Sequence, residues 1–274
     1  MKCAWQELIR ILPTWLGVEA DNHRESLQEI RLRLGQPTEL ITWKGNMWLP
    51  RMAEENDLKY CMNTASRYSP WAAQSIAKGY LTAYGGHRIG ICGDAVIKHG
   101  EMTGIRKVES INIRIARDFP GIAASAKNMQ GSILIIGPPG SGKTTMLRDL
   151  ARLISERETV SVVDERGELF PEGFQRGRRM DVLTGCSKSE GIDTVLRTMG
   201  PECIAVDEIT SEKDCAALLR SGWCGVRLAA TAHAFSLSNL KTRPIYIPLL
   251  KTKLFSNVLI MNRDKSWKLE RMDT

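Results

Sequence analysis

The sequence lacks the features that mark membrane, secreted and disulfide-built proteins. No apolar run approaches membrane-spanning length, and residues 1–16 lack the apolar core of a signal peptide. The seven cysteines are odd in number and include no C-x-x-C pair, which argues against a disulfide framework and against zinc. Aromatic residues make up only 6% and form no obvious stacking platform for bases. These absences predict a protein of the reducing cytoplasm.

What is present fits an ordinary soluble chain with an uneven charge. The 274 residues, 43% hydrophobic and 25% charged, suffice for two domains. Residues 216–274 contain ten Lys and Arg but three acids, which accounts for the whole net charge of +7. Such a basic tail suits an anionic membrane surface, a nucleic acid or an acidic protein, and equally a solvated face.

A glycine-rich stretch organises the rest of the chain. Gly137, Gly142, Lys143 and Thr144 occupy the fixed places of the P-loop pattern G-x-x-x-x-G-K-[ST]. The apolar run 132–136 before it predicts a buried strand, and apolar residues from Met146 to Ile154 recur at helical spacing after it. A glycine-rich turn without a ligand is the alternative, but strand, loop and helix follow in the order that phosphate binding requires.

Each residue type in the loop has a chemical task. Gly140 and Gly142 let backbone N–H groups face an anion, Lys143 would bridge the β- and γ-phosphates, and the Thr144 hydroxyl would bind Mg²⁺. Thr145 is placed to reach the α-phosphate. The predicted ATP-binding residues are Gly137, Pro138, Pro139, Gly140, Ser141, Gly142, Lys143, Thr144 and Thr145.

Polar residues follow three further apolar runs. Residues 159–163 lead into Asp164 and Glu165, 203–206 into Asp207 and Glu208, and 226–231 into His233. Intervening helical patterns predict a mostly parallel α/β sheet, and ligands gather at the carboxyl ends of its strands. We therefore expect these side chains beside the P-loop.

The acidic pairs suit phosphoryl transfer. Asp207 and Glu208 fit the Walker B pattern, in which the Asp holds Mg²⁺ and the Glu polarises the attacking water. Asp164 could share the metal and Glu165 could be the base instead; the sequence leaves this open. His233 could sense the γ-phosphate or be purely structural.

The first part of the chain predicts a small α+β domain. Residues 5–16 indicate one amphipathic helix, for docking or surface anchoring, and strands are expected at 29–34, 40–43 and 110–116. A helix is expected at 71–80 and a hairpin-like segment at 85–93. Pro37 should end the first strand. The predicted domains are 1–125 and 126–274, divided in the polar stretch after Pro120.

These motifs together resemble a known family. The P-loop, the acidic stretch 164–168, the strand end 204–208 and Thr231-Ala232-His233 resemble the Walker A, Asp box, Walker B and His box of type II and type IV secretion ATPases. The resemblance is closer still to the stage III sporulation AA family. It rests on E-I-R-L-R-L-G at 29–35, G-Y-L-T-A-Y-G-G-H-R-I-G at 79–90, I-N-I-R-I-A-R at 111–117, V-D-E-R-G-E at 163–168, R-M-D-V-L-T-G-C at 179–186 and A-V-D-E-I at 205–209.

The resemblance implies a RecA-like, ATP- and Mg²⁺-dependent ATPase. It implies a homo-oligomeric ring, with a hexamer as the candidate assembly, that is cytoplasmic and peripheral to the mother-cell membrane. It also implies membrane-embedded sporulation channel proteins as partners. It also implies arginines supplied to a neighbouring subunit's nucleotide, here Arg88, Arg114 or Arg117 and less so Arg106, unless these simply lie on a strand face. A nucleic-acid-dependent ATPase and a non-hydrolysing assembly subunit are the alternatives. The secretion ATPases often carry Gly at the position of Asp207.

Overall fold

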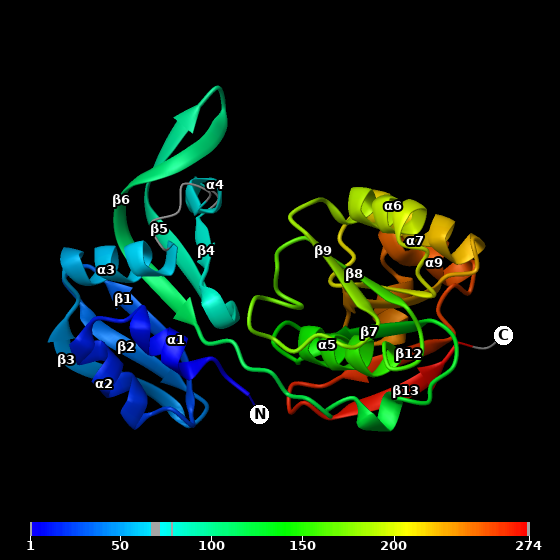
Figure 1. Cartoon of the computed structure of the whole chain (residues 1–274), viewed down its shortest axis with the longest axis horizontal. Coiled ribbons are helices and arrows are strands. Elements are labelled where there is room, and N and C mark those ends of the chain that lie inside the picture. The colour runs from blue at the N-terminus through cyan, green and yellow to red at the C-terminus, as the bar shows by residue number, and fades with distance from the viewer. Residues whose placement is uncertain (1, 67–71, 78, 273–274) are drawn as a thin grey trace. The chain divides into compact units, whose positions relative to one another are not determined.

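The computed structural model describes residues 2–66, 72–77 and 79–272, with the side chains of 72–74 left aside. The chain forms two compact units, one of residues 1–118 with 171–174 and the other of residues 119–170 with 175–274 (Figure 1). Our sequence-based division lay a few residues later, at 125/126.

The first unit is a six-stranded sheet with helices. Its elements are α1 (Trp5–Arg10), α2 (Thr14–Asn22), β1 (Leu27–Arg33), β2 (Pro37–Thr42), β3 (Gly45–Met52), α3 (Glu55–Ser66), α4 (Ala72–Ala77), β4 (Tyr80–Thr82), β5 (Arg88–Lys98) and β6 (Glu101–Arg114). The strand order is β3-β2-β1-β6-β5-β4, and every pairing is antiparallel. One apolar core joins the sheet to α1, α2 and α3.

Three expectations for this unit were wrong in detail. The helix expected over 5–16 is two helices, because Pro13 lacks an amide hydrogen and stands at the N-cap of α2. Pro37 does not end a strand but begins β2, a position where its missing N–H is tolerated. The strand expected at 110–116 starts at Glu101, and its first half went unseen because most of its side chains are exposed. The helix expected at 71–80 appears as α4, although Trp71 and Lys78 lie outside the described residues.

The second unit is a seven-stranded sheet between helices. Its elements are β7 (Ile133–Gly137), α5 (Lys143–Ile154), β8 (Val160–Asp164), β9 (Met180–Thr184), α6 (Lys188–Thr198), β10 (Cys203–Val206), α7 (Glu212–Trp223), β11 (Arg227–His233), α8 (Leu237–Lys241), α9 (Ile247–Lys251), β12 (Asn257–Met261) and β13 (Trp267–Arg271). The strand order is β13-β12-β7-β11-β10-β8-β9, and only the edge strand β13 runs antiparallel.

The central strands are apolar on both faces because helices cover both. In β7, Ile133 and Ile135 enter the core with α5, whereas Leu134 and Ile136 enter the core with α6 and α7. This two-sided burial explains why the strands read as continuous apolar runs. Strands β9, β12 and β13 were not predicted, although Asn257–Met261 is as apolar as β7.

Candidate active site

The loop after β7 has the shape of a phosphate cradle. Gly142 is the N-cap of α5 and has φ 97°, and Gly140 has φ 73°, conformations that other residues rarely adopt. A Cβ on Gly137 would lie 2.6 Å from Ser141 Oγ and 2.7 Å from Met261 O. Only glycine therefore fits at the start of the loop. The Ser141 hydroxyl within it is buried and has no hydrogen-bond partner in the structure, as expected of a group that awaits a ligand.

Lys143 is turned inward, towards the strand ends. Its Nζ donates to Pro138 O at 3.0 Å and lies 3.1 Å from His233 Nδ1. Burial lowers the pKa of Lys143, while the charges of Asp207 and Glu208 oppose that shift. An ammonium can only donate, so Nδ1 must accept and the proton of neutral His233 sits on Nε2. That nitrogen lies 3.0 Å from Glu208 Oε1, which links Lys143 to Glu208 through one imidazole.

Strand register brings the other groups to the same place. Val163 pairs with Val206 near the ends of β8 and β10, and Gly137 pairs with His233 at the ends of β7 and β11. Val206 pairs with Ala230, so β11 runs three residues past the end of β10, at the same edge of the sheet. The Thr144 hydroxyl donates to Asp207 Oδ2 at 2.8 Å, and the Thr231 hydroxyl donates to Asp207 Oδ1 at 2.6 Å. A hydroxyl and a carboxylate side by side are oxygen ligands of the kind that Mg²⁺ takes beside nucleotide phosphates. The residues present therefore fit a bound Mg²⁺.

Glu208 is held in an unusual backbone conformation. Its φ is 54°, a left-handed value that is uncommon for a residue other than glycine. The Glu208 N–H donates to the Thr231 hydroxyl at 2.7 Å, so Thr231 fixes Asp207 and Glu208 together. Strain of this kind gathers at functional sites. Thr231 was not among our predicted site residues, although its place in the Thr-Ala-His motif was a usable signal.

Asp164 and Glu165 are engaged differently. Asp164 is buried, and its carboxylate accepts from the N–H groups of Glu168, Leu169 and Phe170 at 2.8, 2.8 and 3.1 Å. Burial raises the pKa of Asp164 despite these donors, and the nearby charge of Asp207 raises it further. Glu165 pairs with Lys188 at the start of α6, at 2.6 Å. The structure therefore gives both acids partners outside the Lys143–Asp207 cluster.

Removing the Asp164 carboxylate should mainly destabilise the fold. We expect Asp164→Ala to lower the free energy of unfolding by roughly 2–4 kcal/mol, because three N–H groups, two of them buried, lose their acceptor. Asp164→Asn keeps one acceptor oxygen and should lie between Asp164→Ala and the wild type. Chemical denaturation measures both variants. An Asp164→Ala protein of unchanged stability with a higher Mg²⁺ requirement would instead make Asp164 a metal ligand.

The predicted arginines all lie in the first unit. Arg88 and Arg114 are direct cross-strand partners and therefore share one face of the sheet. Arg114 Nε donates to Glu29 Oε1 at 3.2 Å, and Arg88 lies 5.5 Å from the centre of the Tyr80 ring. The register of β1 against β6 puts Arg31 and Arg33 on the neighbouring strand, residues that we had not considered.

The other two arginines are engaged elsewhere. Arg117 donates to the backbone oxygens of Arg24 and Leu27 at 2.6 and 3.0 Å, which is a structural role. Arg106 lies on the exposed part of the β5–β6 hairpin, 3.9 Å from Asp94. Arg88 and Arg114 are therefore the best placed of the four to act together.

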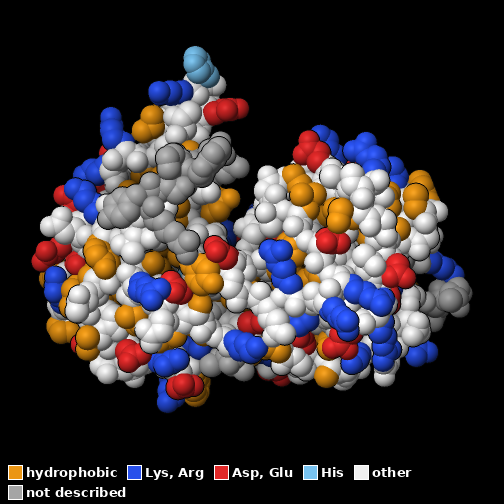
Figure 2. Space-filling view, viewed as in Figure 1, with side chains coloured by type: hydrophobic (Ala, Val, Ile, Leu, Met, Phe, Trp, Pro, Cys, Tyr) orange, Lys and Arg blue, Asp and Glu red, His pale blue; other side chains and the backbone are white. Residues whose placement is uncertain are grey.

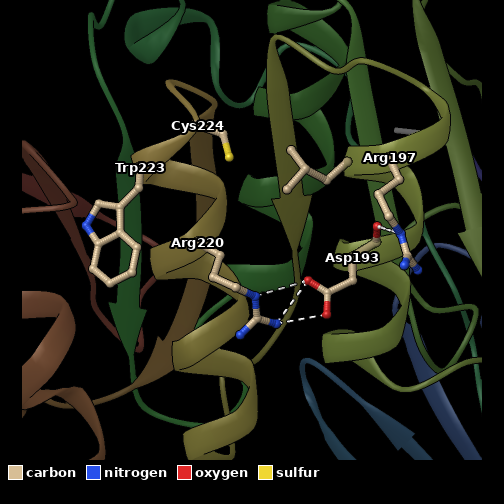
Figure 3. Close-up of a pocket in the computed structure, with 6 residues that line it drawn as sticks. Asp193, Arg197, Arg220, Trp223 and Cys224 are labelled. Atoms are coloured by element: carbon tan, nitrogen blue, oxygen red, sulfur yellow. Dashed lines mark hydrogen bonds and ion pairs between the residues drawn. The ribbon is translucent and has the colours of Figure 1, made fainter.

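A groove on the second unit is separate from this cluster. It lies between α6 and α7, has a volume of about 420 Å³, and shares no residue with the P-loop or the acidic strand ends. Arg220 and Asp193 face each other across it and are joined by three hydrogen bonds of 2.8, 2.9 and 3.4 Å (Figure 3). On the visible face, basic and acidic side chains are interspersed (Figure 2). The basic surplus thus forms no single-sign patch on that face.

Fold and site together define the class. A mostly parallel sheet carries a phosphate loop, with acidic residues at the ends of neighbouring strands, which is the RecA-like P-loop core that we predicted. The model of the family described as "Sporulation stage III, protein AA" matches residues 6–269. The chain belongs to that family.

Individual relatives agree with the class. The stage III sporulation protein AA of Bacillus subtilis is 37% identical over 257 residues, covering 87% of this chain and 83% of the relative. The solved pilus retraction motor PilT with bound ADP has a TM-score of 0.62 at 15% identity, covering 94% of this chain and 83% of the other. The solved structure of the Legionella pneumophila ATPase DotB has a TM-score of 0.58 at 16% identity, covering 96% of this chain and 80% of the other. The two solved structures confirm the fold.

Among the residues that the structure describes, every helix falls short of the length and apolarity that spanning a bilayer requires.

Proposed function

We propose that the chain hydrolyses ATP to ADP and phosphate as one subunit of a secretion-type motor ATPase that energises a sporulation channel. The observation that carries this proposal is a single connected cluster. Lys143 and Thr144 of the P-loop contact His233 and Asp207 of neighbouring strands, and His233 contacts Glu208. A phosphate-binding loop alone could belong to a protein that only binds nucleotide. A loop that is connected by hydrogen bonds to two carboxylates and an imidazole suits phosphoryl transfer.

The residues divide the work of hydrolysis. The loop N–H groups and Lys143 would hold the phosphates of ATP, with Thr145 reaching the α-phosphate. Thr144 and Asp207 would hold Mg²⁺, which neutralises charge on the phosphates when bound. His233 lies within reach of both Lys143 and Glu208, so it is placed to respond to a γ-phosphate.

Glu208 is the better candidate for the base that orients water. Its carboxylate lies 3.0 Å from His233 inside the cluster. Glu165, the alternative, is paired with Lys188 instead. Because Asp164 is saturated by backbone N–H groups, Asp207 would hold the metal without it.

The biological setting follows from the family. Relatives bear the names of a sporulation protein, a pilus motor and an ATPase. We infer a homo-oligomeric ring, with a hexamer as the candidate assembly, at the inner face of the mother-cell membrane, with membrane-embedded channel proteins as partners. A nucleic-acid-dependent ATPase would differ in its response to DNA or RNA.

Phosphate release by the purified chain tests the proposal. We would measure it with Mg·ATP over a range of protein concentrations, alongside sizing with and without nucleotide. Release that rises with assembly and ceases when EDTA removes the metal supports a motor. Tight ATP binding without release in any assembled state would leave a structural subunit, and stimulation by DNA that falls steeply with salt would favour the nucleic-acid enzyme.

Arg88 and Arg114 should act on a neighbouring subunit. Single Arg88→Ala and Arg114→Ala changes are expected to reduce turnover about 10- to 100-fold, less than a lone arginine finger contributes, because two residues share the charge. Mixing either variant with Lys143→Ala subunits should restore part of the activity, since one chain supplies the arginines and the other the phosphate loop. Phosphate release of the mixture measures this. Mixtures no more active than their separate components would refute action in trans.

A further inference from the structure

A lysine outside every recognised motif touches the phosphate loop. Strand β12 lies beside β7 in parallel, with Ile260 paired to Ile136. The five-residue connection from β12 to β13, residues 262–266, therefore emerges at the same end of the sheet as the P-loop. Lys265 in this connection donates a hydrogen bond from Nζ to the backbone oxygen of Gly140. Its Cδ would lie 3.7 Å from a Cβ on Gly142.

The connection is built to hold this lysine in place. Asn262 N–H donates to Ser266 O at 2.9 Å, and Lys265 N–H donates to Asn262 O at 3.1 Å. Asp264 Oδ1 accepts from the N–H and the hydroxyl of Ser266 at 3.0 and 2.7 Å. Lys265 itself has φ 71°, a left-handed value that a long side chain rarely takes. These hydrogen bonds hold the connection in one conformation, in which the strained Lys265 backbone places its side chain against the P-loop. Backbone strain is found at functional sites, which suggests that the contact between Lys265 and Gly140 has a function.

Lys143 and Lys265 both contact the P-loop, but they do so from different elements. Lys143 contacts Pro138 O and His233, whereas Lys265 contacts Gly140 O from the β12–β13 connection. Gly140 has φ 73°, and a Cβ added to it would meet no atom within 4 Å. Packing on that side of Gly140 therefore does little to hold its backbone in place. The charged Lys265 ammonium donates to the Gly140 carbonyl, and such charge-assisted hydrogen bonds are stronger than neutral ones, so this contact restrains the loop at Gly140.

We propose that Lys265 is a positioning residue for nucleotide binding, which holds the Gly140 carbonyl and so keeps the loop N–H groups turned towards the phosphates. This inference rests on the proposed function, because it presumes that the loop binds a nucleoside polyphosphate. Lys265 acts on the loop and not on the γ-phosphate. Its removal therefore weakens Mg·ADP and Mg·ATP alike and leaves the chemical step intact.

The test compares Lys265→Met, which keeps the length of the side chain, with Arg263→Met in the same connection. Titration with Mg·ADP should show roughly 3- to 10-fold weaker binding for Lys265→Met, within the range for an exposed charged hydrogen bond. KM for ATP should rise by a similar factor while kcat stays unchanged, and Lys265→Arg should recover most of the affinity. Arg263→Met removes the same charge two residues away and should bind like the wild type.

Hydrogen exchange without nucleotide gives an independent readout. In Lys265→Met the amides of residues 140–142 should exchange faster than in wild type, and those of α9 should not. Unchanged exchange together with unchanged Mg·ADP affinity overturns the proposal, as does an equal loss in Arg263→Met or a loss confined to ATP. Failure of the wild type to bind Mg·ADP would instead sink the proposed function, which distinguishes the two.

Discussion

Replacing Lys143 with alanine is expected to reduce phosphate release roughly 10²- to 10³-fold, the cost of removing one donor aimed at developing charge. The Lys143 ammonium is buried in the structure, where it contacts Pro138 O and the imidazole of His233. Burial lowers the pKa of Lys143, so the fold keeps a cation in a place that disfavours one. A bound triphosphate would add negative charge beside that cation, in addition to the charges of Asp207 and Glu208. Phosphate release at saturating Mg·ATP and nucleotide binding by titration measure the two effects.

Lys188 offers a matched control for this substitution. It too is the first residue of a helix that follows a strand and a loop, and it is similarly buried. Its partner is Glu165, not the His233–Glu208 pair. Lys188→Ala should therefore leave turnover within about threefold of wild type, as expected of a change outside the reacting groups. Equal losses of phosphate release in both variants would contradict a special role for Lys143. They would instead favour Glu165, the partner of Lys188, as the base.

The core of the second unit was predictable because the P-loop motif and the apolar runs that mark its strands are each contiguous in sequence. The P-loop fixes strand, loop and helix within about twenty residues, and parallel strands must end at one edge of the sheet. This logic placed Asp207, Glu208 and His233 near Lys143 before any contact was known. The structure confirms a RecA-like α/β fold, and it adds contacts that spacing cannot show, such as Thr231 between Asp207 and Glu208.

Other features could not be predicted, for physical reasons. Asp164 and Asp207 look alike in sequence, since each ends an apolar strand. They differ because the turn after Asp164 curls its N–H groups back onto the carboxylate. Lys265 lies 125 residues from Gly140, and no local signal links them. The exposed half of the β5–β6 hairpin has no buried face, so the alternation that reveals strands is missing there.

Thr231 explains how the site can keep a strained glutamate. The backbone of Glu208 has φ 54°, and its N–H is held by the Thr231 hydroxyl, which in turn donates to Asp207. One side chain thus fixes the spacing of Asp207, the proposed metal ligand, and Glu208, the proposed base. The Glu208 carboxylate contacts His233 Nε2, and His233 Nδ1 contacts the Lys143 ammonium. A phosphate that attracts Lys143 would therefore change the hydrogen bonding of the Glu208 carboxylate through one imidazole.

Replacing Glu208 with glutamine is expected to reduce kcat about 10²- to 10³-fold, within the range for loss of a general base. Glutamine has almost the same shape and can still accept the hydrogen bond from His233 Nε2, but it cannot take a proton from water. Nucleotide affinity should stay within about threefold of wild type, because the P-loop and Lys143 are untouched. The variant should therefore accumulate bound ATP, which separates the chemical step from binding.

Glu165→Gln is the matched control, since the two glutamates each follow an aspartate at a strand end. Glu165 is paired with Lys188, so this change should leave kcat within about threefold. Single-turnover phosphate release with each variant, with bound ATP and ADP separated after quenching, measures the difference. If Glu208→Gln turned over normally while Glu165→Gln accumulated ATP, the base would be Glu165. The Lys143–His233–Glu208 contacts would then have a structural role only.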